Sequence, residues 1–168
     1  MSTWPAPLET DRLVLRPWRE TDAEALFRYA SDPELGPACG FDPHTSIDDS
    51  RAVLRDCLML PEQYAITIKP SDEAVGAIGL NSEDRNLPLS PTEREVGFWL
   101  GRPFWGNGYM PEATREVLRH GFLDLGLTTI WCGYYEGNEK SARTQEKVGF
   151  HPHHVTESSV DRRGVEHR

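Results

Sequence analysis

The sequence is poor in the features that would place it in several common classes. Its 168 residues include only three cysteines, Cys39, Cys57 and Cys132, which are widely spaced and form no CxxC pair. A disulfide framework and a zinc knuckle are therefore not expected, and each cysteine is predicted to be a small buried residue. No apolar run approaches the roughly 20 residues of a membrane-spanning helix, and no signal peptide is recognisable. We therefore expect a cytoplasmic protein with no membrane partner.

Positive charge is also scarce. The 18 Lys and Arg residues stand against 27 Asp and Glu, which gives a formal net charge of −9. Nucleic acid is bound by cationic surfaces, so a nucleic-acid partner is disfavoured. An acidic surface suits cationic small molecules or peptide amines better. The length and the 38% hydrophobic fraction predict one globular domain over residues 1–168.

Hydrophobic periodicity predicts strands that alternate with helices. Strands are expected over residues 12–17, 64–69, 74–80, 93–100 and 129–134, with another beginning at Phe150. Helices are expected after Thr21, after Ser46, around Pro111 and after Asn138. This order favours an α+β (α/β) fold, with a mixed, largely antiparallel central sheet and about four flanking helices. The two strands that flank the long helix should form a parallel crossover.

The helices carry start signals and apolar stripes. Thr21 and Glu24 are expected to form a capping box, and Ser46 and Asn138 to act as N-caps. The apolar stripes predict three buried faces. Their residues are Ala23, Leu26, Phe27 and Ala30; Val53, Leu54, Cys57 and Leu58; and Ala113, Val117, Leu118, Phe122 and Leu125.

A glycine-rich segment separates the 93–100 strand from the long helix. Gly106 and Gly108 let the backbone turn tightly and point N–H groups out of the first turn of the helix. Aligned donors and the helix dipole favour a phosphate or pyrophosphate there. An ordinary tight turn is the alternative for Gly106-Asn107-Gly108 alone. The segment is not a P-loop, because no Gly-Lys-Ser/Thr follows.

Two polar positions open the last helix, and a histidine cluster follows it. Asn138 can cap that helix, and its amide could also reach a ligand between the preceding strands. Ser141 could donate its hydroxyl outward or be a surface serine. His151-Pro152-His153-His154 has no Cys or carboxylate partner at ligand spacing, so no metal is expected.

Three stretches together resemble the GNAT superfamily of N-acetyltransferases, and more closely its RimJ/RimL-like branch. They are residues 8–16 with Asp22-Ala23, residues 95–100 and 105–113, and Asn138-x-x-Ser141 with residues 146–150. They occur in the order of that family. The resemblance implies the GNAT fold, in which splayed strands surround a coenzyme A groove.

The resemblance also implies acetyl-CoA as the donor and a primary amine as the acceptor, either a small molecule or a protein N-terminal α-amine. In that family the strand before the loop binds the pantetheine arm, the loop N–H groups hold the pyrophosphate, and the Asn contacts the cofactor arm. These roles fall on Phe98, Trp99 and Leu100; on Trp105, Gly106, Asn107, Gly108, Tyr109 and Met110; and on Asn138. A noncatalytic acyl-CoA-binding module and a nucleotide- or phosphate-binding enzyme are the alternatives, and a homodimer is left open.

The expected chemistry needs a base and an acid. An amine arrives mostly as ammonium, with a pKa of about 8 for an α-amine and about 10.4 for a lysine-type amine. Glu95 is the first candidate to take its proton and Glu93 the second, with a solvated strand carboxylate as the alternative for each. A backbone N–H of residues 98–100 would hold the oxyanion, and Ser141 would protonate the thiolate.

The chain departs from the general family pattern in two places. Trp105 and Met110 stand where the general loop has Gln/Arg and Gly/Ala, which removes a cationic phosphate contact. The family's final strand would follow, and residues 165–168 are expected to be its beginning. In this family the region of the acidic segment 42–56 shapes the acceptor site, so its carboxylates could attract a cationic amine. A solvated helix face is the alternative.

Overall fold

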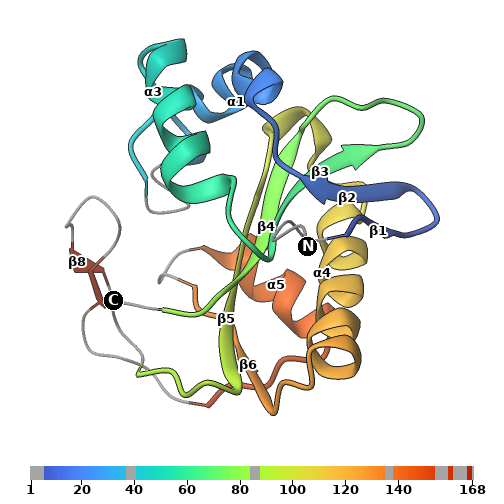
Figure 1. The fold of residues 1–168 in the computed structure, drawn as a ribbon. Coiled ribbons are helices and arrows are strands. Elements are labelled where there is room, and N and C mark those ends of the chain that lie inside the picture. The colour runs from blue at the N-terminus through green and yellow to red at the C-terminus, as the bar shows by residue number, and fades with distance from the viewer. Residues whose placement is uncertain are drawn as a thin grey trace.

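A mixed six-stranded sheet forms the centre of the computed structural model (Figure 1). The structure describes residues 6–36, 41–83, 88–134, 138–153, 159–160 and 166–167. The sheet has the order β1-β2-β3-β4-β5-β6. Its strands are β1 (Leu8–Glu9), β2 (Leu13–Pro17), β3 (Gln63–Ile68), β4 (Gly76–Asn81), β5 (Glu93–Leu100) and β6 (Thr129–Trp131).

Every neighbouring pair in this sheet is antiparallel except β5 and β6, which are parallel. The helix α4 (Tyr109–Arg119) makes the crossover between these two strands. The predicted mixed sheet and parallel crossover are therefore confirmed. The strand predicted over residues 129–134 is shorter, because pairing with β5 ends at Trp131.

The C-terminal part differs from the prediction. No strand begins at Phe150; its N–H donates to the carbonyl of Gln145 and so closes the preceding helix. The strands β7 (Ser159–Val160) and β8 (Glu166–His167) pair with each other in a separate two-stranded sheet. Residues 165 and 168 of the expected final strand lie outside the described residues, as do Cys39 and His154.

Helices cover both faces of the sheet (Figure 1). The helices α1 (Ala23–Ala30) and α3 (Ile47–Val53) lie on one side, and α4 and α5 (Glu139–Lys147) on the other. Successive strand residues point to opposite faces, so Ala65 joins the core under α1 while Tyr64 and Ile66 join the core under α4. None of the helices in the described ranges has both the length and the apolar character needed to cross a bilayer.

Two π-helical turns explain where burial differs from expectation. They are η2 (Leu54–Leu58), which continues α3, and η4 (His120–Asp124), which continues α4. Each is closed by a bond from residue i+5, with N···O distances of 2.7 Å for Met59 to Leu54 and 3.0 Å for Leu125 to His120. The wider turn rotates later side chains away from the 3.6-residue stripe. Cys57, Phe122 and Leu125, predicted to be buried, are therefore exposed.

The predicted N-caps are partly correct. Ser46 accepts a hydrogen bond from the N–H of Asp49 at 3.2 Å, and Asn138 accepts one from the N–H of Ser141 at 3.2 Å, which confirms both caps. The capping box at Thr21 and Glu24 is wrong, because the chain first forms the short turn η1 (Glu20–Asp22) and Thr21 is exposed.

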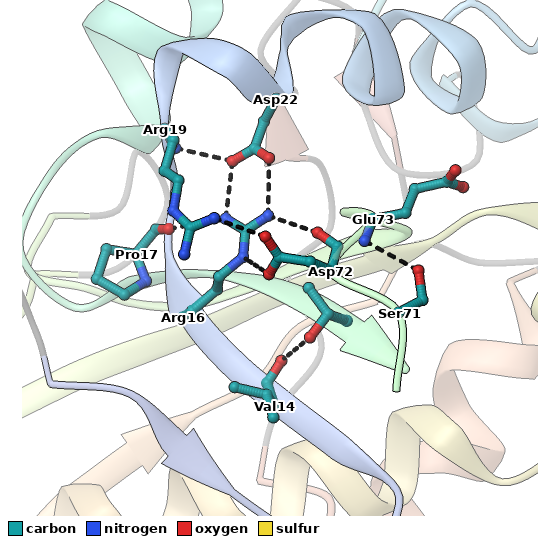
Figure 2. Close-up of polar contacts among 9 residues, drawn as sticks. Val14, Arg16, Pro17, Arg19, Asp22, Ser71, Asp72 and Glu73 are labelled. Carbon is teal, nitrogen blue, oxygen red and sulfur yellow. Dashed lines mark hydrogen bonds and ion pairs between the residues drawn. The ribbon is translucent and has the colours of Figure 1, made fainter. Parts of the chain in front are cut away.

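A buried ion pair fixes the start of α1 (Figure 2). Arg16, only 3% exposed, donates to both carboxylate oxygens of Asp22 at 2.9 and 2.7 Å. It also donates to Asp72, on the connection between β3 and β4, at 2.8 Å. A buried charge is tolerated only when it is paired in this way. Asp22 is thereby held by β2, which positions α1 against the sheet.

Candidate active site

The glycine-rich loop runs from β5 into the first turn of α4. Gly106 and Gly108 have φ angles of +82° and +77°, in the left-handed region that favours glycine. The Asn107 amide donates to the carbonyl of Phe104 at 3.1 Å and braces the turn. Within the described part of the chain, the backbone N–H groups of residues 106–110 meet no acceptor. These donors and the positive end of the helix dipole favour an anion.

Two cations lie beside this loop, and the sequence analysis missed both. Arg12 donates to the carbonyl of Asn107 at 2.9 Å, with its guanidinium 4.5 Å from the centroid of the Tyr109 ring. The ammonium of Lys140 lies 3.6 Å from the centroid of the Trp105 ring. The absence of Gln or Arg at position 105 therefore does not leave the loop without positive charge. Arg12 and Lys140 come from distant segments, so only the fold could reveal their place.

Glu112 fastens the first turn of α4 to the β1–β2 hairpin. Its carboxylate accepts from the side chain of Arg12 at 2.7 Å, from the Arg12 N–H at 3.0 Å and from the Thr10 hydroxyl at 2.5 Å. Partial burial opposes ionisation, but these hydrogen bonds hold the pKa of Glu112 below its usual value. The carboxylate is therefore charged at neutral pH and holds Arg12 next to the loop.

The strand β5 has a partly unpaired edge. Its pairing with β6 ends at the register pair Glu95 and Trp131, so among the described residues no strand covers that edge from residue 97 to 100. Phe98 and Leu100 face the core under α4, and Trp99 faces the core under α1. The carbonyl of Leu100 accepts from the Trp105 indole at 2.7 Å. Other backbone groups of this edge can bind an extended ligand.

The two candidate bases differ in their surroundings. Glu93 accepts a hydrogen bond from the Trp131 indole at 2.9 Å, which gives its carboxylate a structural partner. Glu95 is half-buried and lies opposite Asn81 in the register of β4 and β5. A side-chain carbon placed on Gly97 would lie 3.5 Å from Glu95 Oε1 and 3.2 Å from Asn81 Nδ2. The Glu95 carboxylate therefore lies along the strand towards Gly97.

The residues that open α5 form a short chain of hydrogen bonds. The Ser141 hydroxyl accepts from the Gln145 amide at 3.3 Å, and the same amide donates to the carbonyl of Gly133 at 3.1 Å. Ser141 is half-buried and keeps its own hydroxyl proton for donation. Within the described ranges, the hydrogen bonds of Ser141 join it to Asn138 and Gln145.

Cys132 follows the end of β6, and His153 packs against Trp131 of the same strand. Burial, with the nearby Glu95 carboxylate, raises the pKa of the Cys132 thiol, so this partly buried residue stays neutral. The His153 ring meets the edge of Trp131 at a centroid distance of 4.8 Å. Among the described residues, no group of three or more His, Cys, Asp or Glu side chains is placed to hold a metal.

A cavity of about 420 Å³ lies on the opposite face of the sheet, below α1 and α3. Its lining comes from α1, from residues 41–44, from α3 and η2, and from Trp99 of β5. This is the region that the acidic segment was expected to shape. All four aspartates are exposed, but only Asp42 and Asp49 also line the cavity, while Asp48 and Asp56 do not. The acidic segment is thus divided between a cavity wall and a solvated helix face.

Known proteins share both the sequence pattern and the fold. The uncharacterized N-acetyltransferase p20 of Bacillus licheniformis is 31% identical over 148 residues, which cover 85% of this chain and 81% of p20. YdaF of Bacillus subtilis (strain 168), whose name places it provisionally among ribosomal N-acetyltransferases, is 32% identical over 65 residues, covering 39% of this chain and 36% of YdaF.

A solved structure has the same fold. The microcin C7 self-immunity acetyltransferase MccE, solved in complex with acetyl-CoA and AMP, superposes with a TM-score of 0.74 at 21% identity. The match covers 94% of this chain and 91% of the MccE chain. In addition, the acetyltransferase (GNAT) domain family matches residues 12–151. The chain therefore belongs to the GNAT family of acetyltransferases.

Proposed function

We propose that this protein transfers an acetyl group from acetyl-CoA to a primary amine, with both substrates bound at once. The observation that carries the proposal is the loop at the start of α4, whose N–H groups at residues 106–110 lack acceptors in the described chain. Lys140 adds positive charge beside it, and Arg12, held by Glu112, donates to the loop carbonyl of Asn107. Family membership supports acetyl transfer, and the MccE complex supports acetyl-CoA as the donor.

The residues present suit a coenzyme A donor. A pyrophosphate needs several convergent donors, which the loop supplies without a P-loop lysine. An extended pantetheine arm needs open backbone groups, which the edge of Phe98–Leu100 supplies. Asn138 and Ser141 lie at the start of α5, the helix whose Lys140 contacts the loop residue Trp105. A nucleotide-binding enzyme would use the loop alone and leave the β5 edge without a role.

The chain's own groups account for the proton movements. The amine nitrogen attacks the thioester carbonyl carbon, and the C–S bond breaks. Glu95 takes the proton that the amine loses, directly or through water, and Ser141 donates a proton to the departing thiolate. A backbone N–H of residues 98–100 stabilises the oxyanion. The fold also holds the two substrates in contact, which contributes to the rate.

The proposal also includes the branch of the family to which the protein belongs and the compartment in which it acts. The loop sequence Trp105-Gly106-Asn107-Gly108-Tyr109 and the partial match to YdaF support the RimJ/RimL-like branch. The cytoplasm remains the expected compartment, and the acceptor is a primary amine.

A thiol-release assay with acetyl-CoA and a panel of amines tests the proposal. We expect Glu95→Gln to lower kcat by about 10²–10⁴-fold, the usual contribution of a general base. Glu93→Gln is the comparison, because Glu93 is the second candidate on the same strand and a larger loss there would make it the base. If Glu95→Gln and Ser141→Ala both keep full turnover, the assigned roles are wrong. Acetyl-CoA binding with no turnover of any amine would instead indicate a noncatalytic acyl-CoA-binding module.

A further inference from the structure

The cavity below α1 and α3 has a largely apolar wall that includes aromatic rings. Leu26 of α1 and Leu58 of η2 contribute aliphatic surface. The Phe41 ring lies 5.9 Å from the His44 ring and 6.2 Å from the Trp99 ring, measured between centroids. The volume of about 420 Å³ falls in the range of small-molecule sites. The wall therefore suits a compact apolar group of about the size of a ring.

The charged groups of the lining are carboxylates. Asp42 and Asp49 line the cavity, and no Lys or Arg occurs among its described lining residues. Hydrogen bonds from the side chain and backbone of Thr45 hold the pKa of Asp49 below its usual value, so it is ionised at neutral pH. Burial lowers the pKa of His44, whose Nδ1 lies 2.8 Å from the Ser50 hydroxyl. The cavity therefore attracts cations and repels anions.

Trp99 connects this cavity to the strand that carries the proposed chemistry. Side chains alternate along β5, so Trp99, Gly97 and Glu95 face the same side of the sheet. Trp99 and Glu95 are four residues apart along the strand, but the Glu95 carboxylate reaches back to Gly97, so about 7 Å remains to be bridged, which a small amine with a ring can span. Gly97 lacks a side chain at the point where one would meet the Glu95 carboxylate. An acceptor seated against Trp99 can therefore extend its amine along this face towards Glu95.

We propose that the acceptor is a small-molecule amine carried on an apolar body of ring size, and that this body binds in the cavity formed by Leu26, Phe41, His44, Leu58 and Trp99. The inference rests on the proposed acetyl transfer and names the acceptor class for it. The carboxylates of Asp42 and Asp49 attract the ammonium form as it enters.

The same lining disfavours two other classes of amine, the aminosugars and the polyamines. An aminosugar would have to bury many hydroxyl groups against a wall with few polar partners. A polyamine has no compact apolar body to fill the space between Phe41 and Trp99. Arylalkylamines such as phenylethylamine and tryptamine satisfy both the apolar wall and the acidic mouth.

Cys57 provides a probe of occupancy that does not depend on turnover. Its thiol is exposed and lines the cavity. The full-length protein is treated with a maleimide in the presence of tryptamine, spermidine, kanamycin or a tripeptide amide beginning with phenylalanine. Modification of Cys57 is followed by peptide mass mapping. We expect tryptamine to slow it at least about fivefold at saturation, and spermidine and kanamycin to leave it unchanged.

A pocket-filling variant supplies the second measurement. Ala52→Trp adds an indole to the lining, and Arg51→Trp adds the same group to the exposed side of α3 as the matched control. We expect Ala52→Trp to raise the KM for tryptamine by about 10-fold or more, since pockets discriminate even single methylene groups. Its Kd for acetyl-CoA should not change. Arg51→Trp should leave both constants unchanged.

The outcomes separate this inference from the proposed function. Acetylation of spermidine, kanamycin or the peptide amide at a higher kcat/KM than tryptamine would overturn the acceptor class while acetyl transfer stands. An unchanged KM in a folded Ala52→Trp protein, with no protection of Cys57 in the wild type, would also overturn it. Protection of Cys57 by tryptamine without thiol release from acetyl-CoA would support the pocket assignment and refute the transfer.

Discussion

The loop at the start of α4 would bind its ligand through backbone groups, whereas the cavity below α1 and α3 would bind its ligand through side chains. The loop presents backbone N–H groups, held in place by the left-handed conformations of Gly106 and Gly108. The cavity is lined by side chains from two helices, residues 41–44 and Trp99. A backbone site depends on a few residues and suits a ligand part that does not vary. A side-chain site can change with each residue, so it suits the part of the reaction that differs between relatives.

The largest expected effect is a loss of stability when the ion pair that holds α1 over the cavity is broken. Arg16→Ala leaves Asp22 buried without its partner, and we expect it to lower the free energy of unfolding by about 3–5 kcal/mol. Arg28→Ala is the control, because Arg28 is exposed in its pair with Glu73 and exposed pairs contribute little to stability. Urea unfolding of both variants measures the difference. Equal losses would show that the buried pair does not hold α1.

A glycine substitution separates the loop's binding role from its folding role. Gly106→Ala and Gly126→Ala each place a side chain at positive φ, +82° and +69°, with no atom within 4 Å of the added carbon. Both should lose about 1–2 kcal/mol of stability. Only Gly106→Ala should weaken acetyl-CoA binding, by about 10-fold, because it reorients the loop N–H groups. Calorimetric titration of both variants checks this, and equal affinities would contradict the assignment.

The charge of Lys140 should have a smaller effect on the same site. Lys140→Ala removes the ammonium beside Trp105, and we expect the Kd for acetyl-CoA to rise by about fivefold at low salt. The loss should shrink as salt screens the interaction. Lys147→Ala, at the other end of α5, is the control and should leave the Kd unchanged. A salt-independent loss, or an equal loss in Lys147→Ala, would place the phosphates elsewhere.

The smallest expected effect is the change that His44, in the cavity wall, causes in the free energy of unfolding as the pH falls. Burial lowers the pKa of His44 below its usual value of 6.5, so between the two values the unfolded chain binds more protons. The free energy of unfolding should therefore fall as pH drops below about 6.5. Denaturant midpoints at several pH values should show a smaller fall in His44→Gln. The pKa of Asp49 is also lowered, so its contribution is lost only at lower pH.

Local patterns were enough to predict much of the fold. The bounds of β5 follow from its alternation and flanking turns, and Ser46 and Asn138 cap their helices as expected because an N-cap is a local interaction. The errors at Cys57 and Phe122 share one cause. Both lie in π-helical turns, which do not follow the 3.6-residue period from which burial was predicted.

The candidate site, too, was predicted from the sequence only in part. The sequence motif points to the loop because glycines at fixed spacing carry its conformation. It could not place Arg12 and Lys140 beside the loop, since both reach it through tertiary packing. It named Glu95 before Glu93 as the base but could not show the bond that Glu93 accepts from the Trp131 indole, which depends on the pairing of β5 with β6. The cavity was expected only as an acidic region, and its aromatic wall depends on how three segments pack.

The most direct test of the account is a calorimetric titration of the full chain with acetyl-CoA, with ATP and 3′,5′-ADP as comparisons. We predict micromolar binding of acetyl-CoA and none of ATP, because the loop and the open edge of β5 together suit a pyrophosphate with an extended arm. A well-folded protein that binds no acetyl-CoA, or that binds ATP as tightly, would contradict the proposal and leave only a shared fold.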